Sequence, residues 1–162
     1  GVESGSEELL REYRKGYTLD DIREAFDLAR RAGLRTAGTF LLGGPRETRE
    51  TCMQTIRLSC ALPCDFASFN VFTPRPGTEL YSQALAEGLL HAGAVSDQSG
   101  SAIAVRTRFL SSDDLLTFKR MAVRSFYGRP GYLLRQMRQV RSLSELKIKL
   151  RSACALAGNN RI

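Results

Sequence analysis

A pair of glycines at the end of an apolar segment is the first feature of this 162-residue chain that could support chemistry. Residues 34–42 are mostly apolar and long enough for a buried strand, and Gly43-Gly44-Pro45 follows them directly. Parallel α/β sheets bind ligands beyond this carboxyl end of their strands, where glycines let the backbone come close to a ligand. The alternative is a tight turn that needs a positive φ. The spacing matches neither a P-loop nor a G-x-G-x-x-G fingerprint.

The cysteine and histidine residues form no recognisable metal-binding or catalytic pattern. Cys52, Cys60, Cys64 and Cys154 lack the spacing of a zinc or cluster site. Cys52 and Cys60 also lie within a helical pattern, where small buried thiols are common. We expect no metal role for the cysteines and no catalytic role for His91, which lies in a polar, loop-like stretch.

The elements that must position the glycine turn alternate between helix and strand. The pattern predicts strands over 34–42 and 66–72, and helices over 7–15, 20–32, 48–62 and 78–87. This order is typical of a parallel sheet with crossover connections. Two strands cannot form a doubly covered sheet, so we expect a further strand to end just before Gly1, in a missing N-terminal part of a longer protein.

The character of the chain changes after residue 88. Residues 91–104 are mostly small and polar, which is typical of a surface connection, and we expect a connecting loop over 89–110. Residues 111–162 are predicted to be a helical extension, with helix starts at Ser111 and Pro130 and a last helix that ends near Ala157.

Composition favours a single globular domain with a basic C-terminal part. The chain has a mass of 18.0 kDa, 43% hydrophobic residues and a net charge of +7. Residues 106–151 hold twelve Lys or Arg residues against three acids, a charge that would suit nucleic acid or an anionic partner. No apolar stretch is long enough to span a membrane and no secretory leader is visible, so we expect a cytoplasmic protein with reduced cysteines.

Four motifs in order resemble the second half of a radical S-adenosylmethionine (SAM) enzyme core. They are G-V-E-S-G-S at 1–6, R-K-G-Y-T at 14–18, F-L-L-G-G-P-R-E-T at 40–48 and F-T-P-R-P-G-T-E-L-Y at 72–81. They are most similar to the cobalamin-binding-domain-containing branch that includes the anaerobic magnesium-protoporphyrin ester cyclase type. S-F-Y-G-R-P-G-Y-L-L at 125–134 resembles the segment that closes that group.

The resemblance implies a fold, a set of cofactors and a reaction. Residues 1–88 would be the C-terminal half of a partial (β/α)6 TIM-like barrel, followed by the all-helical basic tail. The missing N-terminal half would hold a [4Fe-4S] cluster on a three-cysteine loop, with cobalamin as a candidate further cofactor and a ferredoxin or flavodoxin as electron donor. Reductive cleavage of SAM would yield a 5′-deoxyadenosyl radical for methyl transfer or cyclisation on a small molecule. The fragment alone should not catalyse.

The resemblance also implies SAM contacts by position. Glu3 and Ser4, at the end of the strand lost before Gly1, would reach polar groups of SAM, since a carboxylate accepts several hydrogen bonds. Lys15 would face the SAM carboxylate. The alternatives are an acid placed before a helix for Glu3 and a cation near a helix C-terminus for Lys15.

Two further strand ends complete the implied site. Gly43 and Gly44 would let the backbone approach the adenosyl group, and Phe72 and Thr73 would flank the adenine. Phe72 is otherwise an ordinary core residue. Arg46 stands where the family pattern Gly-x-Pro-Gly-Glu-Thr has its second glycine, so the turn could be reshaped there.

Two other functions compete with this interpretation. The basic tail could bind nucleic acid, as in tRNA-modifying methylthiotransferases. Its arginines, however, alternate with apolar residues at helical spacing, which favours packed helices with solvated charges, so we do not expect a nucleic-acid partner. A phosphate-binding barrel half is the third possibility. Arg75, between two prolines, could lie over the mouth of a cavity or in a solvated turn.

Overall fold

A computed structural model describes residues 1–74, 76–89 and 107–138. The chain divides into two compact units, Gly1–Phe126 and Tyr127–Ile162, and each is described by itself. His91, Arg75, Cys154 and the predicted last helix lie outside the described residues.

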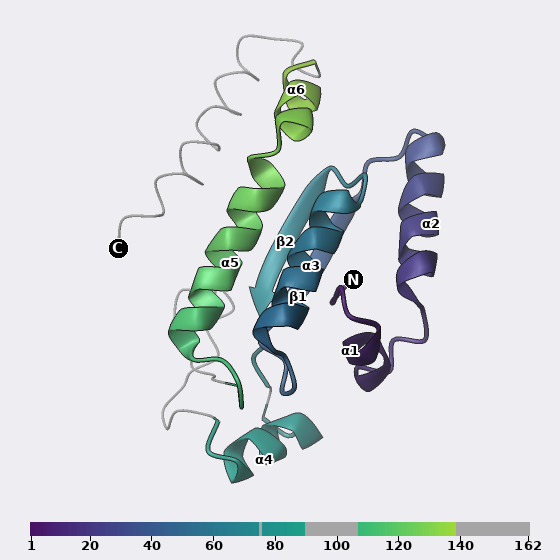
Figure 1. The fold of residues 1–162 in the computed structure, drawn as a ribbon. Coiled ribbons are helices and arrows are strands. Elements are labelled where there is room, and N and C mark those ends of the chain that lie inside the picture. The colour runs from purple at the N-terminus through teal and green to yellow at the C-terminus, as the bar shows by residue number, and fades with distance from the viewer. Residues whose placement is uncertain (75, 90–106, 139–162) are drawn as a thin grey trace. The chain divides into compact units, whose positions relative to one another are not determined.

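The described residues form a mixed α/β structure (Figure 1). The elements in chain order are α1 (Glu7–Glu12), α2 (Leu19–Arg31), β1 (Ala37–Leu42), α3 (Arg49–Ala61), β2 (Phe66–Val71), α4 (Glu79–Ala86), α5 (Ser112–Tyr127) and α6 (Pro130–Arg138). The predicted helix–strand alternation is confirmed. The division of the chain at residues 88 and 110 stays a prediction.

The two strands are parallel, as the sequence predicts. β1 pairs with β2 so that Phe40 lies opposite Phe69. On the other side of β1, Glu3 forms an isolated parallel bridge with Phe40, and the backbone N–H of Leu41 donates to the carbonyl of Glu3 at 2.7 Å. The segment that ends at Glu3 therefore runs as a third parallel neighbour of β1.

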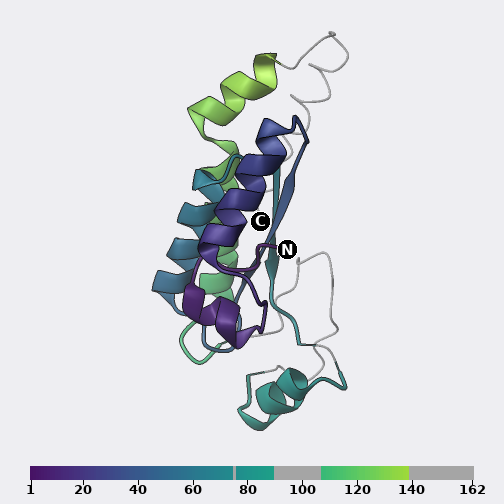
Figure 2. The same ribbon diagram turned by 90° about the vertical axis from the view of Figure 1, so that its right-hand side faces the viewer.

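The core lies on one face of this sheet. Side chains of alternate residues on β1 are buried, and the ring of Phe40 stacks on Phe69 with a centroid distance of 5.1 Å. Phe126 of α5 meets Phe69 edge to face at 6.3 Å. Figure 2 shows α2, α3 and α5 on this side of the strands, while no described helix of the unit Gly1–Phe126 covers the opposite face of β1 and β2.

Helix boundaries follow local capping chemistry. Thr18 and Asp21 form a reciprocal capping box at the start of α2, and Thr48 and Thr51 form another at the start of α3. Gly33 follows the last turn of α2 and takes a φ of +71°, a conformation that glycine adopts readily at helix ends.

Two predicted boundaries were wrong. The first helix ends at Glu12 rather than residue 15, because the backbone turns at Arg14, whose φ is +52°. Ser6 stands at its N-cap position but makes no side-chain capping hydrogen bond. β1 begins at Ala37 rather than residue 34, because the N–H of Leu34 still closes α2 by donating to Ala29. Among the described residues, no helix is long and apolar enough to cross a membrane.

Replacing Gly43 by Ala should destabilise the chain more than the same change at Gly33. Both glycines have positive φ, +88° and +71°, so both substitutions carry a similar backbone cost. A Cβ at Gly43 would lie 2.9 Å from a methyl carbon of Leu115, whereas one at Gly33 would meet nothing within 4 Å. We expect an extra loss of about 1–3 kcal/mol in unfolding free energy for Gly43→Ala, measured by denaturant titration. Equal losses in the two variants would contradict the Leu115 contact.

Candidate functional site

An ion pair between Glu3 and Lys15 lies at the end of the first parallel segment. The Nζ of Lys15 is 3.0 Å from Oε1 of Glu3, and the two side chains remain 33% and 22% exposed. Glu3 adopts a φ of +67°, which non-glycine residues rarely do, and the bridge to β1 holds it there. The structure thus brings together two of the residues that the sequence singled out.

Ser4, the third of these residues, lies in the interior. Its fully buried hydroxyl is 3.4 Å from Oγ1 of Thr55 and accepts a hydrogen bond from the N–H of Ser6 at 3.1 Å. The N–H of Gly5 donates to the same Thr55 oxygen at 2.9 Å. These contacts fasten the turn after Glu3 to α3, and Glu3 is more accessible than Ser4.

The Gly43-Gly44 turn is organised by a buried carboxylate. Oε2 of Glu47 accepts the N–H of Gly43 at 2.5 Å and the N–H of Gly44 at 3.1 Å. The Glu47 side chain is completely buried. The carboxylate therefore occupies both glycine amides and fixes the connection from β1 to α3.

The far side of the turn is closed by Tyr13. A Cβ added to Gly44 would lie only 1.9 Å from the Tyr13 hydroxyl, so only glycine fits there. Within the described part of the chain, the Tyr13 hydroxyl and Oε1 of Glu47 are buried without a hydrogen-bond partner. Arg46, on the exposed side, contacts Glu8 and Glu12 at 3.5 and 3.8 Å, and the positive φ falls at Gly43 rather than at position 46.

Burial dominates the electrostatics of this turn. It raises the pKa of Glu47 to about 7, although the amides of Gly44 and Gly43 and the Cys52 thiol favour the ionised form. Burial, followed by the nearby Glu47 charge, raises the pKa of Tyr13 and of Cys52. Tyr13 and Cys52 therefore stay neutral at physiological pH, and Glu47 titrates near it.

The end of β2 lies beside this turn. The N–H of Phe72 donates to the carbonyl of Leu42 at 2.7 Å, which continues the ladder to the residue before Gly43. The Thr73 hydroxyl lies 3.4 Å from the Val71 carbonyl, and both Phe72 and Thr73 are half-buried. The predicted residues of both strand ends thus meet at one edge of the sheet.

Comparison with known proteins shows the family of this chain. Residues 1–59 match the model of the radical SAM superfamily. The chain is 33% identical over 137 residues to an uncharacterized methyltransferase of Pyrococcus horikoshii. The matched region covers 85% of this chain and 30% of the relative. The chain belongs to the radical SAM superfamily.

Two other relatives match a shorter part of this radical SAM chain. The anaerobic magnesium-protoporphyrin IX monomethyl ester cyclase of Cereibacter sphaeroides is 31% identical over 51% of the chain and 14% of its own length. A tRNA-2-methylthio-N(6)-dimethylallyladenosine synthase of Thermus thermophilus is 36% identical over 49% of the chain and 18% of its own length. The chain thus spans less than a third of each relative cited.

The described part of the radical SAM chain contains no group of three His, Cys, Asp or Glu side chains that could hold a metal ion. Cys52 and Cys64 are buried, and burial raises the pKa of both thiols, which disfavours the thiolate that an iron–sulfur cluster needs. The donor set of these residues therefore does not fit a [4Fe-4S] cluster.

Sequence reasoning missed Glu47 and Tyr13. Glu47 belongs to the family pattern Gly-x-Pro-Gly-Glu-Thr, and its spacing of four residues from Gly43 could have indicated a carboxylate folded back onto the turn amides. Tyr13 gave no comparable signal, because its contact with Gly44 joins residues that are distant in sequence.

Replacing Glu47 by Gln should remove a pH-dependent loss of stability. The carboxyl keeps its proton up to about pH 7 in the folded chain but has an ordinary pKa of 4.5. The folded state therefore binds the extra proton, and unfolding free energy falls as pH rises through this window, by on the order of 2–3 kcal/mol. Between pH 5 and pH 8, urea titrations should show Glu47→Gln gaining stability relative to the wild type.

The control is Glu24→Gln, which changes an exposed glutamate on α2. Its stability should follow the wild type at every pH. Parallel curves for the wild type and Glu47→Gln would show that the raised pKa of Glu47 is wrong.

Proposed function

We propose that this chain forms the SAM-binding strand ends of a partial (β/α)6 barrel in a radical SAM enzyme. The carrying observation is the Glu3–Lys15 pair, 3.0 Å apart at the end of the first parallel segment. Both residues fall within residues 1–59, which match the superfamily.

The chemistry of this pair suits the methionyl end of SAM. A carboxylate such as Glu3 accepts hydrogen bonds from an ammonium or from ribose hydroxyls, and an ammonium such as Lys15 donates to a carboxylate. Each side chain neutralises the other in this structure. When SAM binds, its methionyl ammonium would pair with Glu3 and its carboxylate with Lys15. The glycine turn and Phe72 would then lie on the adenosyl side.

The barrel proposal is supported by the sheet face that no described helix of the unit Gly1–Phe126 covers (Figure 2). Thr39 on β1 and Ser68 and Asn70 on β2 are exposed and alternate with the buried Phe40 and Phe69, so they belong to this face. Apolar residues on the other face pack under helices, which is the arrangement of barrel strands with helices outside. Further strands of the same protein would close the barrel around this polar lining.

The remaining cofactors would be held by chain outside these residues. We propose that an N-terminal part carries the [4Fe-4S] cluster and receives electrons from a ferredoxin or flavodoxin, and that cobalamin is a candidate further cofactor. When bound, SAM supplies a 5′-deoxyadenosyl radical through its reductive cleavage. The residues of this chain bind SAM, orient it and exclude water.

For the outcome of the reaction we propose methyl transfer or cyclisation on a small molecule. The match that extends over 137 residues is to a protein named as a methyltransferase, and a second relative is named as an ester cyclase. The ester cyclase and the tRNA-modifying synthases each match about half of the chain. We do not favour a nucleic-acid substrate, because the arginines of the basic tail alternate with apolar residues at helical spacing.

The expected result of removing either charge is weaker use of SAM. In the whole protein, reconstituted without oxygen and supplied with SAM and a reductant, Glu3→Gln and Lys15→Gln should each raise the SAM concentration for half-maximal 5′-deoxyadenosine formation by roughly 10–100-fold. This follows from the loss of one hydrogen bond to a charged group. Product is measured by liquid chromatography.

Arg11→Gln serves as the matched control, because it removes an exposed positive charge from the neighbouring helix α1. It should leave the SAM dependence unchanged. Wild-type SAM dependence in both site variants would contradict the proposed contacts, and a wild-type protein that makes no 5′-deoxyadenosine would contradict the proposed reaction.

A further inference from the structure

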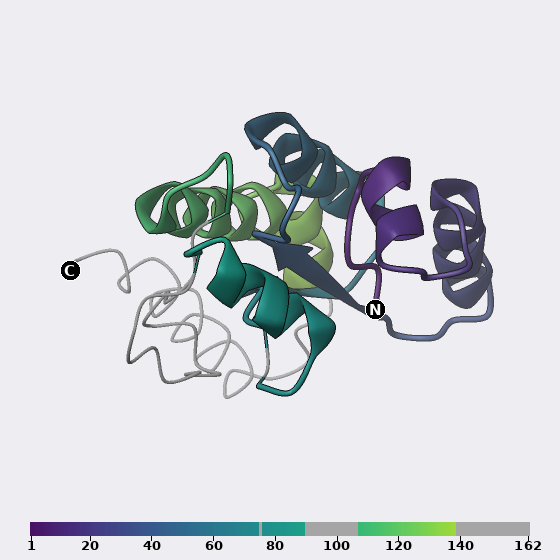
Figure 3. The same ribbon diagram turned by 90° about the horizontal axis from the view of Figure 1, so that it is seen from below.

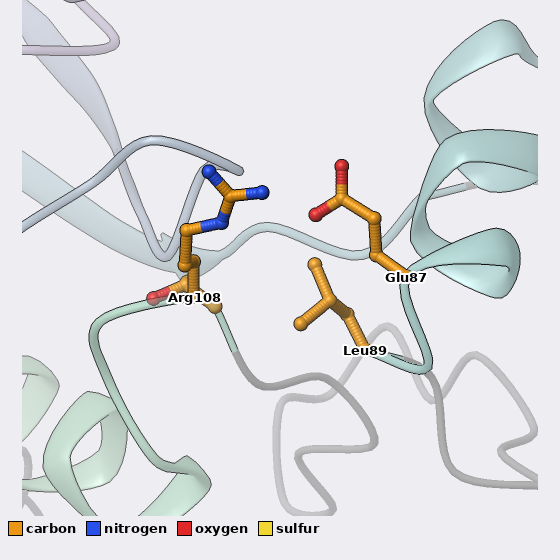
Figure 4. A pocket seen from close by; sticks show the side chains of 4 residues that line it. Glu87, Leu89 and Arg108 are labelled. Atoms are coloured by element: carbon orange, nitrogen blue, oxygen red, sulfur yellow. The ribbon is translucent and has the colours of Figure 1, made fainter.

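A polar pocket, separate from the Glu3–Lys15 pair, lies beyond the carboxyl ends of the strands. Glu87, Leu89, Thr107 and Arg108 line it, and its volume is about 430 Å³. Figure 4 shows the side chains of Glu87 and Arg108 on opposite sides of the pocket, with Leu89 below Glu87 on the same side. The volume falls within the range of small-molecule pockets, roughly 300–1,000 Å³.

The chain connects both walls to the ends of the sheet. α4, which leads to Glu87, follows β2 after a short loop and lies beyond the strand ends in Figure 1. Figure 3, viewed from below, shows α4 at this same end of the sheet. On the other wall, the segment from Thr107 leads into α5, whose Leu115 packs against Gly43. The pocket is therefore on the side of the sheet where the strand ends meet.

The wall that carries Glu87 is held by a helix-ending motif. The N–H of Gly88 donates to the carbonyl of Leu85 at 3.1 Å, and the N–H of Leu89 donates to Ala84 at 2.8 Å. Gly88 takes the positive φ of +64° that this motif requires. Glu87 is thus fixed at the helix C-terminus, where a negative charge is electrostatically unfavourable and helix stability gives no reason for it.

The wall that carries Arg108 is a tight turn built on Thr107. The buried Thr107 hydroxyl accepts hydrogen bonds from the N–H groups of Phe109 and Leu110, at 3.2 and 2.9 Å. The N–H of Thr107 in turn donates to the Leu110 carbonyl at 2.9 Å. Because Thr107 is engaged within the turn, its role is to hold the backbone from which Arg108 projects.

The two charges are not used elsewhere in the described structure. Neither Glu87 nor Arg108 forms an ion pair with the other or with any further described residue. Two opposite charges on separately fixed walls, with an apolar side chain beside them, are arranged to orient a polar ligand rather than to satisfy each other.

We propose that this pocket binds a small ligand through an anionic group, a carboxylate or a phosphate, held by Arg108. Guanidinium groups bind both anions with two parallel hydrogen bonds. Glu87 faces the opposite end of the ligand and accepts a hydrogen bond from an ammonium or hydroxyl group there. The pocket is independent of the SAM contacts, because none of its residues belongs to them.

The test is protection of Arg108 from phenylglyoxal, a reagent specific for arginine, in the full chain without SAM or reductant. Modification is followed residue by residue by mass spectrometry, with inorganic phosphate or acetate as the probe and chloride at equal ionic strength as the reference. Arg120, exposed on α5, is the internal control. We expect a saturable, severalfold slowing at Arg108 by at least one probe and none at Arg120.

The two probes distinguish a phosphate-bearing ligand from a carboxylate-bearing one. Glu87→Gln should strengthen the protection by any probe that protects the wild type. Phosphate and acetate are anions that the negative charge of Glu87 repels, and the variant removes that charge. Equal modification of Arg108 in phosphate, acetate and chloride would overturn the proposal. Failure of this proposal can be distinguished from failure of the proposed radical SAM reaction. The protection of Arg108 tests only the pocket, and the formation of 5′-deoxyadenosine tests only the reaction.

Discussion

The hydrogen bonds from the Gly43 and Gly44 amides to the buried carboxylate of Glu47 are the constraint on which the rest of the structure depends. Burying a carboxylate is unfavourable, and burial therefore raises the pKa of Glu47 to about 7. The two amides offset part of it, because bonds between a charged acceptor and backbone N–H groups are stronger than neutral ones. Since Glu47 immediately precedes the capping residue Thr48, the same contact sets where α3 leaves the sheet.

Two helices close over the turn that Glu47 holds. Tyr13, at the end of α1, fills the space beside Gly44, and Leu115 of α5 fills the space beside Gly43. An ion pair between Arg49 and Asp114 joins the first turns of α3 and α5. Packing and the positive φ of Gly43 therefore account for both glycines, so they are poor evidence for a ligand. The case for SAM depends instead on Glu3 and Lys15.

Features determined by nearby residues were predictable from the sequence. The alternation of helix and strand was predicted, and the structure confirms it. The caps at Thr18 and Thr48 and the positive φ of Gly33 are local features of the same kind. The proximity of Glu3 to Lys15 followed only from the family resemblance, since a loop and a helix separate them.

Features that depend on tertiary packing were not predictable in the same way. The early end of α1 accompanies the packing of Tyr13 against Gly44, and the burial of Ser4 depends on Thr55 of a helix fifty residues away. Glu47 had the right spacing for its role, but nothing local indicates that a charged side chain will be fully buried. The sequence therefore did not reveal the burial or the contacts of residues whose partners lie far away along the chain.

The most direct test of the account is a crystal structure of the whole protein with SAM, grown without oxygen. The account predicts that the methionyl group lies within hydrogen-bonding distance of Glu3 and Lys15, at the edge where the parallel strands end, while Glu47 keeps both glycine amides. A SAM molecule bound away from Glu3 and Lys15 would contradict the central claim.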